Sequence, residues 1–264
     1  MYNFREVFLN LSFNKSNKMN FINYKNVIII VIILISNKVF SQNNKGVAIY
    51  TKSYVENVDV KETFISKQMK NMKQEFESLN FNLRFTKDES IFEVLESINL
   101  EDNMLAKLAL TVGGSNGLFY INTKDRSILN SKESFGQEFI VKKALESIKW
   151  NLHNETKRID NYVCYKATAI YVVINNKGTF NHPVEAWYTT EIPVGFGPIG
   201  YGGLPGLIVE LSVQNFKYQM QQITFNPNKQ FKIKKPTKGK LVTEAEFNAI
   251  GKEAMGNFKN RITN

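Results

Sequence analysis

The 264-residue chain has little of what usually builds disulfide scaffolds and metal sites, with one cysteine and two histidines. With Cys164 alone no internal disulfide can form, so the stability of the fold must come from its core. His153 and His182 do not stand at a zinc-binding spacing such as H-x-x-x-H or H-E-x-x-H, and we expect both in surface loops. We therefore predict neither a metal nor a cofactor.

Signals for nucleophilic and nucleotide chemistry are weak as well. No G-K-[ST] triplet is present to end a P-loop. Cys164 stands in the middle of an apolar strand pattern, where a buried, unreactive thiol is expected rather than an activated nucleophile. We predict no catalytic residue from these motifs.

No hydrophobic run reaches the roughly 20 residues that a membrane-spanning helix needs. The run VIIIVIILI at 27–35 has nine residues and follows Lys25, and Val39-Phe40-Ser41 fits a small-residue cleavage site. This is the layout of a secretory signal peptide. No cysteine follows the run, so a lipoprotein anchor is not expected.

We therefore predict a signal peptide over 1–41, with Met19 a better start than Met1, and a single domain over 42–264. A retained N-terminal anchor is the alternative. After cleavage no membrane span is expected, and the protein would be periplasmic, associated with the outer membrane, or secreted.

Positive charge is in excess, at +10 for the chain and about +6 for 42–264. Such an excess suits anionic surfaces such as lipopolysaccharide or nucleic acid, and export argues against nucleic acid. Six lysines gather in NKQFKIKKPTKGK, at Lys229, Lys232, Lys234, Lys235, Lys238 and Lys240. They either contact anionic lipid or an acidic partner, or protect an edge strand from aggregation, which we favour.

Apolar and polar residues alternate with a period of two over about ten short segments, which predicts strands. The longest is NYVCYKATAIYVVI at 161–174, whereas HNETKRID at 153–160 is expected to turn the chain. Residues 60–79 have the 3–4 spacing of an amphipathic helix, and 100–110 is either a helix or a loop.

The end of the chain predicts a second long helix. Thr243 and Glu246 form a capping box, with Val242 and Phe247 at the two staple positions. One helical stripe then follows, through Phe247, Ile250, Ala254, Phe258 and Ile262. The predicted fold is mainly β (α+β): one domain with a curved or partly closed antiparallel meander and a helix near each end.

Glycine is concentrated in GFGPIGYGGLPGLIVEL at 195–211, which holds six of the chain's fifteen glycines. A dinucleotide-binding loop is excluded because Pro198 and a following strand replace the required helix. Leu204, Pro205, Gly206 and Leu207 predict a type II turn with positive φ at Gly206, launching a strand buried on both faces. The remaining residues either pack on the protein, which we favour, or form a binding loop of Gly195, Gly197, Pro198, Gly200, Tyr201 and Gly203.

A second candidate face lies on the strand VEAWYTTEIP. Glu185, Trp187 and Glu191 alternate onto one side of it. Two carboxylates there suit acid/base chemistry, and the tryptophan suits stacking on carbohydrate or peptide. A solvated sheet face is the favoured interpretation.

Several segments carry a family resemblance: KGVAIY, FNLRFTKDESIFE, YVCYKATA, AWYTTEIPVGFGPIGYGGLPGLIVEL and KKPTKGKLVTEAEF. Together they resemble the GLPGLI family of exported bacterial proteins over the whole of 42–264. The resemblance implies export from Gram-negative cells and implies no chemistry.

The sequence thus favours an exported, non-enzymatic binding or assembly factor of the Gram-negative cell envelope, with a protein, lipid or peptide ligand. An apolar ligand in the concavity of the sheet predicts a pocket lined by Phe, Leu and Tyr. The alternative is a hydrolase that uses Glu185 or Glu191 near Trp187, which predicts paired polar groups in a cleft.

Overall fold

The structure is a computed structural model that describes residues 45–56, 64–95, 103–175 and 178–263. The chain divides into two compact units, Met1–Asn43 and Asn44–Asn264. The predicted signal peptide and its apolar run lie outside the described residues. None of the helices in the described ranges is long and apolar enough to cross a membrane.

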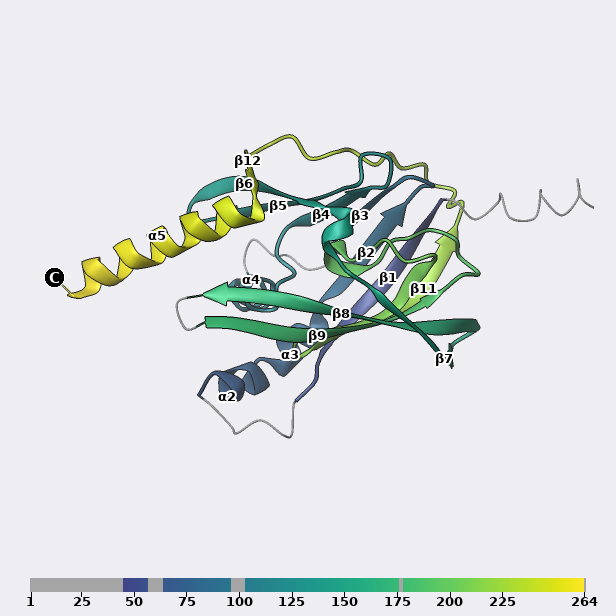
Figure 1. Cartoon of the computed structure of the whole chain (residues 1–264), viewed down its shortest axis with the longest axis horizontal. Helices are drawn as coiled ribbons and strands as arrows, with labels where there is room; N and C mark the ends of the chain where they lie inside the picture. Colours follow the sequence, from purple (N-terminus) through teal and green to yellow (C-terminus); the bar gives the residue numbers. More distant parts are fainter. Residues whose placement is uncertain (1–44, 57–63, 96–102, 176–177, 264) are drawn as a thin grey trace, which may run out of the picture. The chain divides into compact units, whose positions relative to one another are not determined.

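The second unit is built on one twelve-stranded sheet with the order β12-β6-β5-β4-β3-β2-β1-β11-β10-β9-β8-β7 (Figure 1). Neighbouring strands are antiparallel except for β12 and β6. The predicted mainly β, antiparallel architecture is confirmed, and the sheet is not closed. The strands are β1 Gly46–Tyr54, β2 Asn80–Phe85, β3 Glu89–Val94, β4 Leu118–Asn122, β5 Ser127–Ser134, β6 Gln137–Ala144, β7 Asn151–Ile159, β8 Tyr162–Asn175, β9 Gly178–Thr189, β10 Leu207–Val213, β11 Phe216–Phe225 and β12 Lys240–Thr243.

The strand order joins two meanders. Strands β1 to β6 follow one another outward from the centre, with β12 added beyond β6 at the edge, and β7 to β11 follow one another back from the other edge. The two meanders meet where β1 pairs with β11. Side chains from both meanders form the main core, which includes Tyr50, Phe81 and Phe92 from the first and Leu211 and Tyr218 from the second.

The first predicted helix is interrupted. It forms α2 (Phe64–Asn71) and α3 (Lys73–Ser78), with Met72 between them, and the predicted start at Val60 lies outside the described residues. Phe76 on α3 is fully buried against the rings of Tyr54 and Phe216. The segment that the sequence left undecided, 100–110, provides most of α4 (Met104–Val112), whose first turn is capped by Asn103.

The predicted turn at 153–160 is wrong, because most of it belongs to β7. This strand lies at the edge of the sheet and pairs only with β8. An edge strand with two solvated faces needs few apolar residues, so its polar composition resembles that of a turn. His153 therefore lies in β7 and His182 in β9, and neither is in the loop predicted for it.

The basic segment does not form the predicted edge strand. Residues 226–239 run without regular structure from β11 to β12, and only Lys240 of the six lysines lies in a strand. Ile233 packs on a small cluster of Ile91, Tyr120, Leu129 and Ile140, while Lys232 and Lys234 are exposed. The segment therefore covers the face of β3 to β6 that is turned away from the main core.

The C-terminal helix α5 (Glu244–Thr263) begins with the predicted capping box. The Glu246 carboxylate accepts a bond from the Thr243 backbone N–H at 2.7 Å, and the Glu246 N–H donates to Thr243 Oγ1 at 3.2 Å. Phe247 and Ile250 pack on Phe139, Val141 and Val242. The side chains of Phe258 and Ile262 lie outside the description.

Candidate functional site

The glycine segment owes its shape to close backbone packing. The Gly203 N–H donates to Gly195 O, and the Ile208 N–H donates to Phe196 O, both at 2.9 Å. A Cβ on Gly195 would lie 2.6 Å from Leu204 O, and one on Gly197 would lie 2.7 Å from the Ile208 side chain. These glycines therefore let the segment fold back on itself and on β10.

The predicted type II turn at Leu204–Leu207 is wrong. Gly206 is not among the glycines with positive φ, and the Leu207 N–H donates across to Ile192 O at 3.0 Å. Glycine is needed at 206 for another reason, because a Cβ there would lie 1.9 Å from Thr189 O. The prediction that a core strand starts at Leu207 is confirmed, since β10 is buried on both faces.

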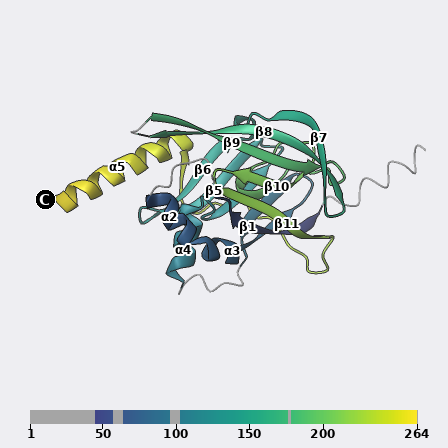
Figure 2. The same cartoon turned by 90° about the horizontal axis from the view of Figure 1, so that it is seen from below.

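A cavity of about 420 Å³ lies between the inner face of β4 to β6 and strand β8. These strands stand near opposite ends of the strand order, so the sheet must curve to bring them face to face, as Figure 2 shows from below. The apolar part of the cavity lining includes Phe119, Ile128, Ile148, Tyr171, Ile199 and Phe216.

The structure divides the predicted binding loop between two pockets. Gly200 and Tyr201 line the cavity, together with Ile199. Gly203 lines a second pocket of about 590 Å³ with Leu204, Pro205, Trp150 and Arg126. Neither pocket is lined by Gly195, Gly197 or Pro198. The two pockets are therefore lined by different residues of this loop.

Ile199 was not singled out from the sequence. Its φ of 45° is unusual, because a β-branched residue is strained in the left-handed region. Such strain is found more often at functional sites than elsewhere. The following Gly200 has a φ of 80°, so two successive residues turn the backbone at the cavity wall.

Two lysines bring positive charge to the cavity. Lys132 on β5 and Lys143 on β6 line it, and Lys143 forms an ion pair with Glu244 at the start of α5. Lys132 lies over the Phe247 ring at 4.2 Å and has no carboxylate partner among the described residues. Burial, and then the nearby Lys143, lower the pKa of Lys132, while Glu244 partly opposes this.

A third lysine lies behind the cavity wall. Lys52 on β1 is 1% exposed, and its Nζ donates to Gly113 O and Ser115 Oγ, both at 3.0 Å. The Phe216 ring lies 4.1 Å from Nζ, and burial lowers the pKa of Lys52 to about 7. The alternation of β1 puts Lys52 on the face of Ala48 and Tyr50, so the sequence pattern itself carried the signal for a buried lysine.

The partner Ser115 belongs to a G-x-S-x-G pattern over 113–117, which was not among the motifs singled out from the sequence. In α/β-hydrolases that pattern joins a strand to a helix and exposes the serine. Here it joins helix α4 to strand β4, and Ser115 is 1% exposed. Ser115 and Lys52 therefore form a buried polar pair that a substrate does not reach in this structure.

The carboxylates of the predicted acid/base face are held by separate partners. Glu191 follows the end of β9 and accepts a bond from the Val163 N–H at 2.9 Å. Glu185 accepts from Trp187 Nε1 at 2.9 Å and pairs with Lys166 at 3.3 Å. Burial alone would raise the pKa of Glu185, but these two partners bring it below its usual value.

Trp187 itself is 8% exposed, and the Lys157 ammonium lies 4.3 Å from its ring centre. Lys157 also pairs with Glu210 at 2.9 Å. The ring therefore lies beneath a paired charge network, which leaves little of its surface for stacking on a ligand.

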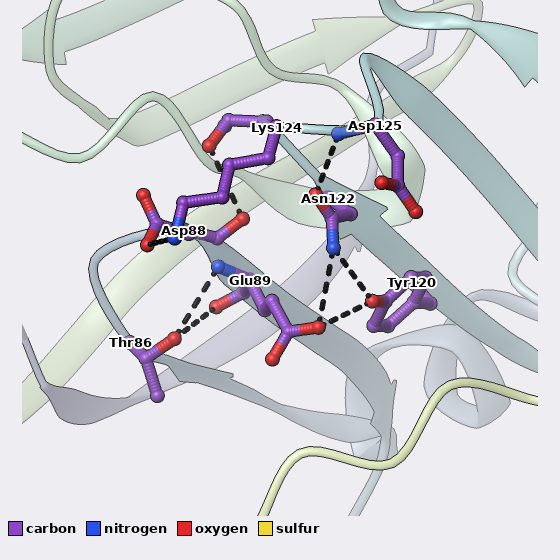
Figure 3. A network of polar contacts seen from close by, with 8 residues as sticks. Thr86, Asp88, Glu89, Tyr120, Asn122, Lys124 and Asp125 are labelled. Carbon is purple, nitrogen blue, oxygen red and sulfur yellow. Dashed lines mark hydrogen bonds and ion pairs between the residues drawn. The ribbon is translucent and has the colours of Figure 1, made fainter.

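A further polar network ties β3 to β4 (Figure 3). Glu89 accepts from the Tyr120 hydroxyl and from Asn122 Nδ2, and Lys124 pairs with Asp88 at 2.7 Å. Burial and the bond to Glu89 raise the pKa of Tyr120 to about 12. These groups are hydrogen-bond or ion-pair partners of one another, so the network fastens β3 to β4.

Cys164 is completely buried, as predicted, and burial raises the pKa of its thiol to about 11. In the described part of the chain, no group of three or more His, Cys, Asp and Glu side chains could hold a metal ion.

Comparisons with known proteins give limited matches. A family model described as a protein of unknown function (Porph_ging) matches residues 176–210, which include β9 and the glycine segment. No curated protein matches the chain. Two solved structures of PNGF-II, in different space groups, are 12% and 13% identical, with TM-scores of 0.47 and 0.46. They cover 78% of this chain, which spans 32% of theirs. The comparisons thus show that one segment of this chain is similar to an uncharacterised family.

Proposed function

We propose that this protein is an exported, non-enzymatic binding or assembly factor of the Gram-negative cell envelope, and that it holds an apolar guest in the cavity between β4–β6 and β8. The observation that carries the proposal is the cavity itself. Its volume of about 420 Å³ falls within the range of roughly 300–1,000 Å³ that small-molecule sites occupy. Its lining combines Phe, Ile, Val and Tyr side chains with polar ones, among them Lys132, Lys143 and Glu244.

Export and family are parts of the same proposal. The apolar run at 27–35 and the Val39-Phe40-Ser41 triplet support a cleaved signal peptide. The GLPGLI-type motifs along 42–264 support an envelope protein of that family. N-terminal sequencing of the exported protein should begin at Gln42, and a retained Met1 or Met19 would contradict cleavage.

Binding is tested with the apolar fluorescent probe N-phenyl-1-naphthylamine and protein purified after export of the full chain. Ala169 on β8 is small, buried and part of the cavity wall, so Ala169→Phe should fill the space and weaken probe binding. Val163→Phe changes an exposed position of the same strand outside the cavity and serves as the matched control. Equal probe binding by folded Ala169→Phe and wild type would contradict the proposal.

The hydrolase alternative has no comparable support. The bonds of Glu185 to Trp187 and Lys166 favour a permanently ionised carboxylate, whereas a general acid needs a raised pKa.

A further inference from the structure

We propose that the guest is an anionic amphiphile: an apolar chain that lies in the cavity and ends in a carboxylate or phosphate held by Lys132 and Lys143. This rests on the proposed binding function of the cavity. It adds the chemical class of the ligand and the residues that select it.

The placement of the two lysines follows from the register of β5 and β6. Asn130 is opposite Val141, and Lys132 and Lys143 stand two residues away on either side of this pair. Because side chains two residues apart share a face, both lysines project on the cavity side of the sheet. The place between them, beside Asn130 and Val141, is therefore a section of the cavity lining flanked by two cations.

The charge of this section is not balanced. Glu244 pairs with Lys143, whereas Lys132 lies over the Phe247 ring and has no ion pair with a carboxylate in the described part of the chain. A half-buried cation without a carboxylate loses hydration and gains little in return. The described charged side chains that line the cavity are Lys132, Lys143 and Glu244, which leaves a net positive charge for an anion to neutralise.

The apolar side chains next to this section are suited to a hydrocarbon chain. They include Phe119, Ile128, Ile199 and Phe216, and glycines at 113 and 114 keep the lining free of larger side chains there. The ammonium of Lys52 lies behind this wall and is occupied by Gly113 O and Ser115 Oγ. A guest with one charged end and one apolar end fits both parts.

The test compares dodecanoate, dodecyl phosphate and uncharged dodecanol as competitors of N-phenyl-1-naphthylamine on protein purified after export of the full chain. The two anions should bind about tenfold more tightly than dodecanol, as expected for one charge-assisted contact. A further preference between the anions would show whether a carboxylate or a phosphate is the natural end group. Equal binding of all three compounds would overturn the inference while leaving the proposed function intact.

Three variants locate the effect. Lys132→Met should remove the preference for the anions over dodecanol, whereas Lys142→Met, an exposed residue on the opposite face of β6, should leave that preference in place. Glu244→Gln releases Lys143 from its ion pair, so it should increase the preference for the anions over dodecanol. An anion preference that survives Lys132→Met would overturn the assignment. Failure of all three compounds to displace a bound probe, or failure of the probe to bind, would instead refute the proposed function and the inference with it.

Discussion

At the scale of single residues, Lys52 shows how much a buried charge depends on its surroundings. Its ammonium is placed at the C-terminal end of α4, among aromatic rings, with two oxygen acceptors and no carboxylate in the described residues. A helix C-terminus favours a cation, but burial outweighs this and lowers the pKa to about 7.

This lysine makes stability depend on pH. Between pH 7 and the unfolded-state value of 10.5, the unfolded chain holds a proton on Lys52 that the folded protein has lost. The contribution of Lys52 to the free energy of unfolding therefore rises with pH in this window, by up to about 1.4 kcal/mol per pH unit, and is constant below it. Lys52→Met should remove this rise. The free energy of unfolding of Lys52→Met minus that of wild type should therefore become smaller, or more negative, as the pH increases.

Urea unfolding at pH 7 and pH 9.5 measures this difference, with the exposed Lys142→Met as control. A difference between wild type and Lys52→Met that stays constant over the two pH values would show that Lys52 titrates as an ordinary surface lysine.

Gly206 gives a second prediction at this scale. A Cβ would lie 1.9 Å from the backbone oxygen of Thr189, the buried last residue of β9, which is held in register opposite Leu207 of β10. Gly206→Ala should therefore lower the free energy of unfolding by about 3 kcal/mol or more. Gly256→Ala in α5, where nothing lies within 4 Å, should instead be neutral or stabilise by up to about 1 kcal/mol. Equal denaturation midpoints for the two variants would refute the steric argument.

At the scale of elements, the capping box of α5 is open to a direct test. Thr243 and Glu246 exchange side-chain and backbone bonds, and the bond from the Thr243 N–H lowers the pKa of Glu246. Thr243→Ala should cost about 0.5–2 kcal/mol. Glu246→Gln keeps an acceptor for the Thr243 N–H and should cost less. Thermal unfolding of both variants measures these losses of stability. A larger loss in Glu246→Gln than in Thr243→Ala would mean that the carboxylate charge rather than the capping box stabilises the start of the helix.

The elements also show where sequence patterns are informative. Strand β10 was predictable because a run of apolar residues after a proline and a glycine has few alternatives. Strand β7 was not, because an edge strand has no buried face to impose alternation. The prediction of an edge strand in the basic segment was wrong for a related reason. Lysine and proline protect an edge strand, but they equally suit an extended segment that packs Ile233 on the sheet.

At the scale of the whole molecule, local patterns predict strands but not which distant strands pair. The pairing of β1 with β11 joins positions about 170 residues apart. The cavity depends on that pairing, since it faces Lys132 of one meander with Tyr171 of the other. Gly200 and Tyr201 were singled out from the sequence and line the cavity, whereas Ile199, Lys132 and Lys143 are recognisable only once the curvature of the sheet is known.

The two meanders should unfold as one unit, because they share a core. The ring of Phe92 in β3 contacts Phe81 of the first meander and Tyr218 of the second, and the Tyr50 hydroxyl donates to Ile208 O at 2.6 Å. Phe92→Ala should cost about 3–5 kcal/mol. The chain has two tryptophans, Trp150 and Trp187, and both lie outside the first meander.

Their fluorescence therefore reports on the second meander, and amide-exchange protection in β2 to β5 reports on the first. In Phe92→Ala the urea midpoints of the two signals should fall by the same amount. Leu241→Ala, at a position 62% exposed on β12, should move neither. If Phe92→Ala lowered the midpoint of exchange protection in β2 to β5 and left the tryptophan transition in place, the meanders would be separate folding units. The cavity between them would then be an interface that can open, rather than a part of a single core.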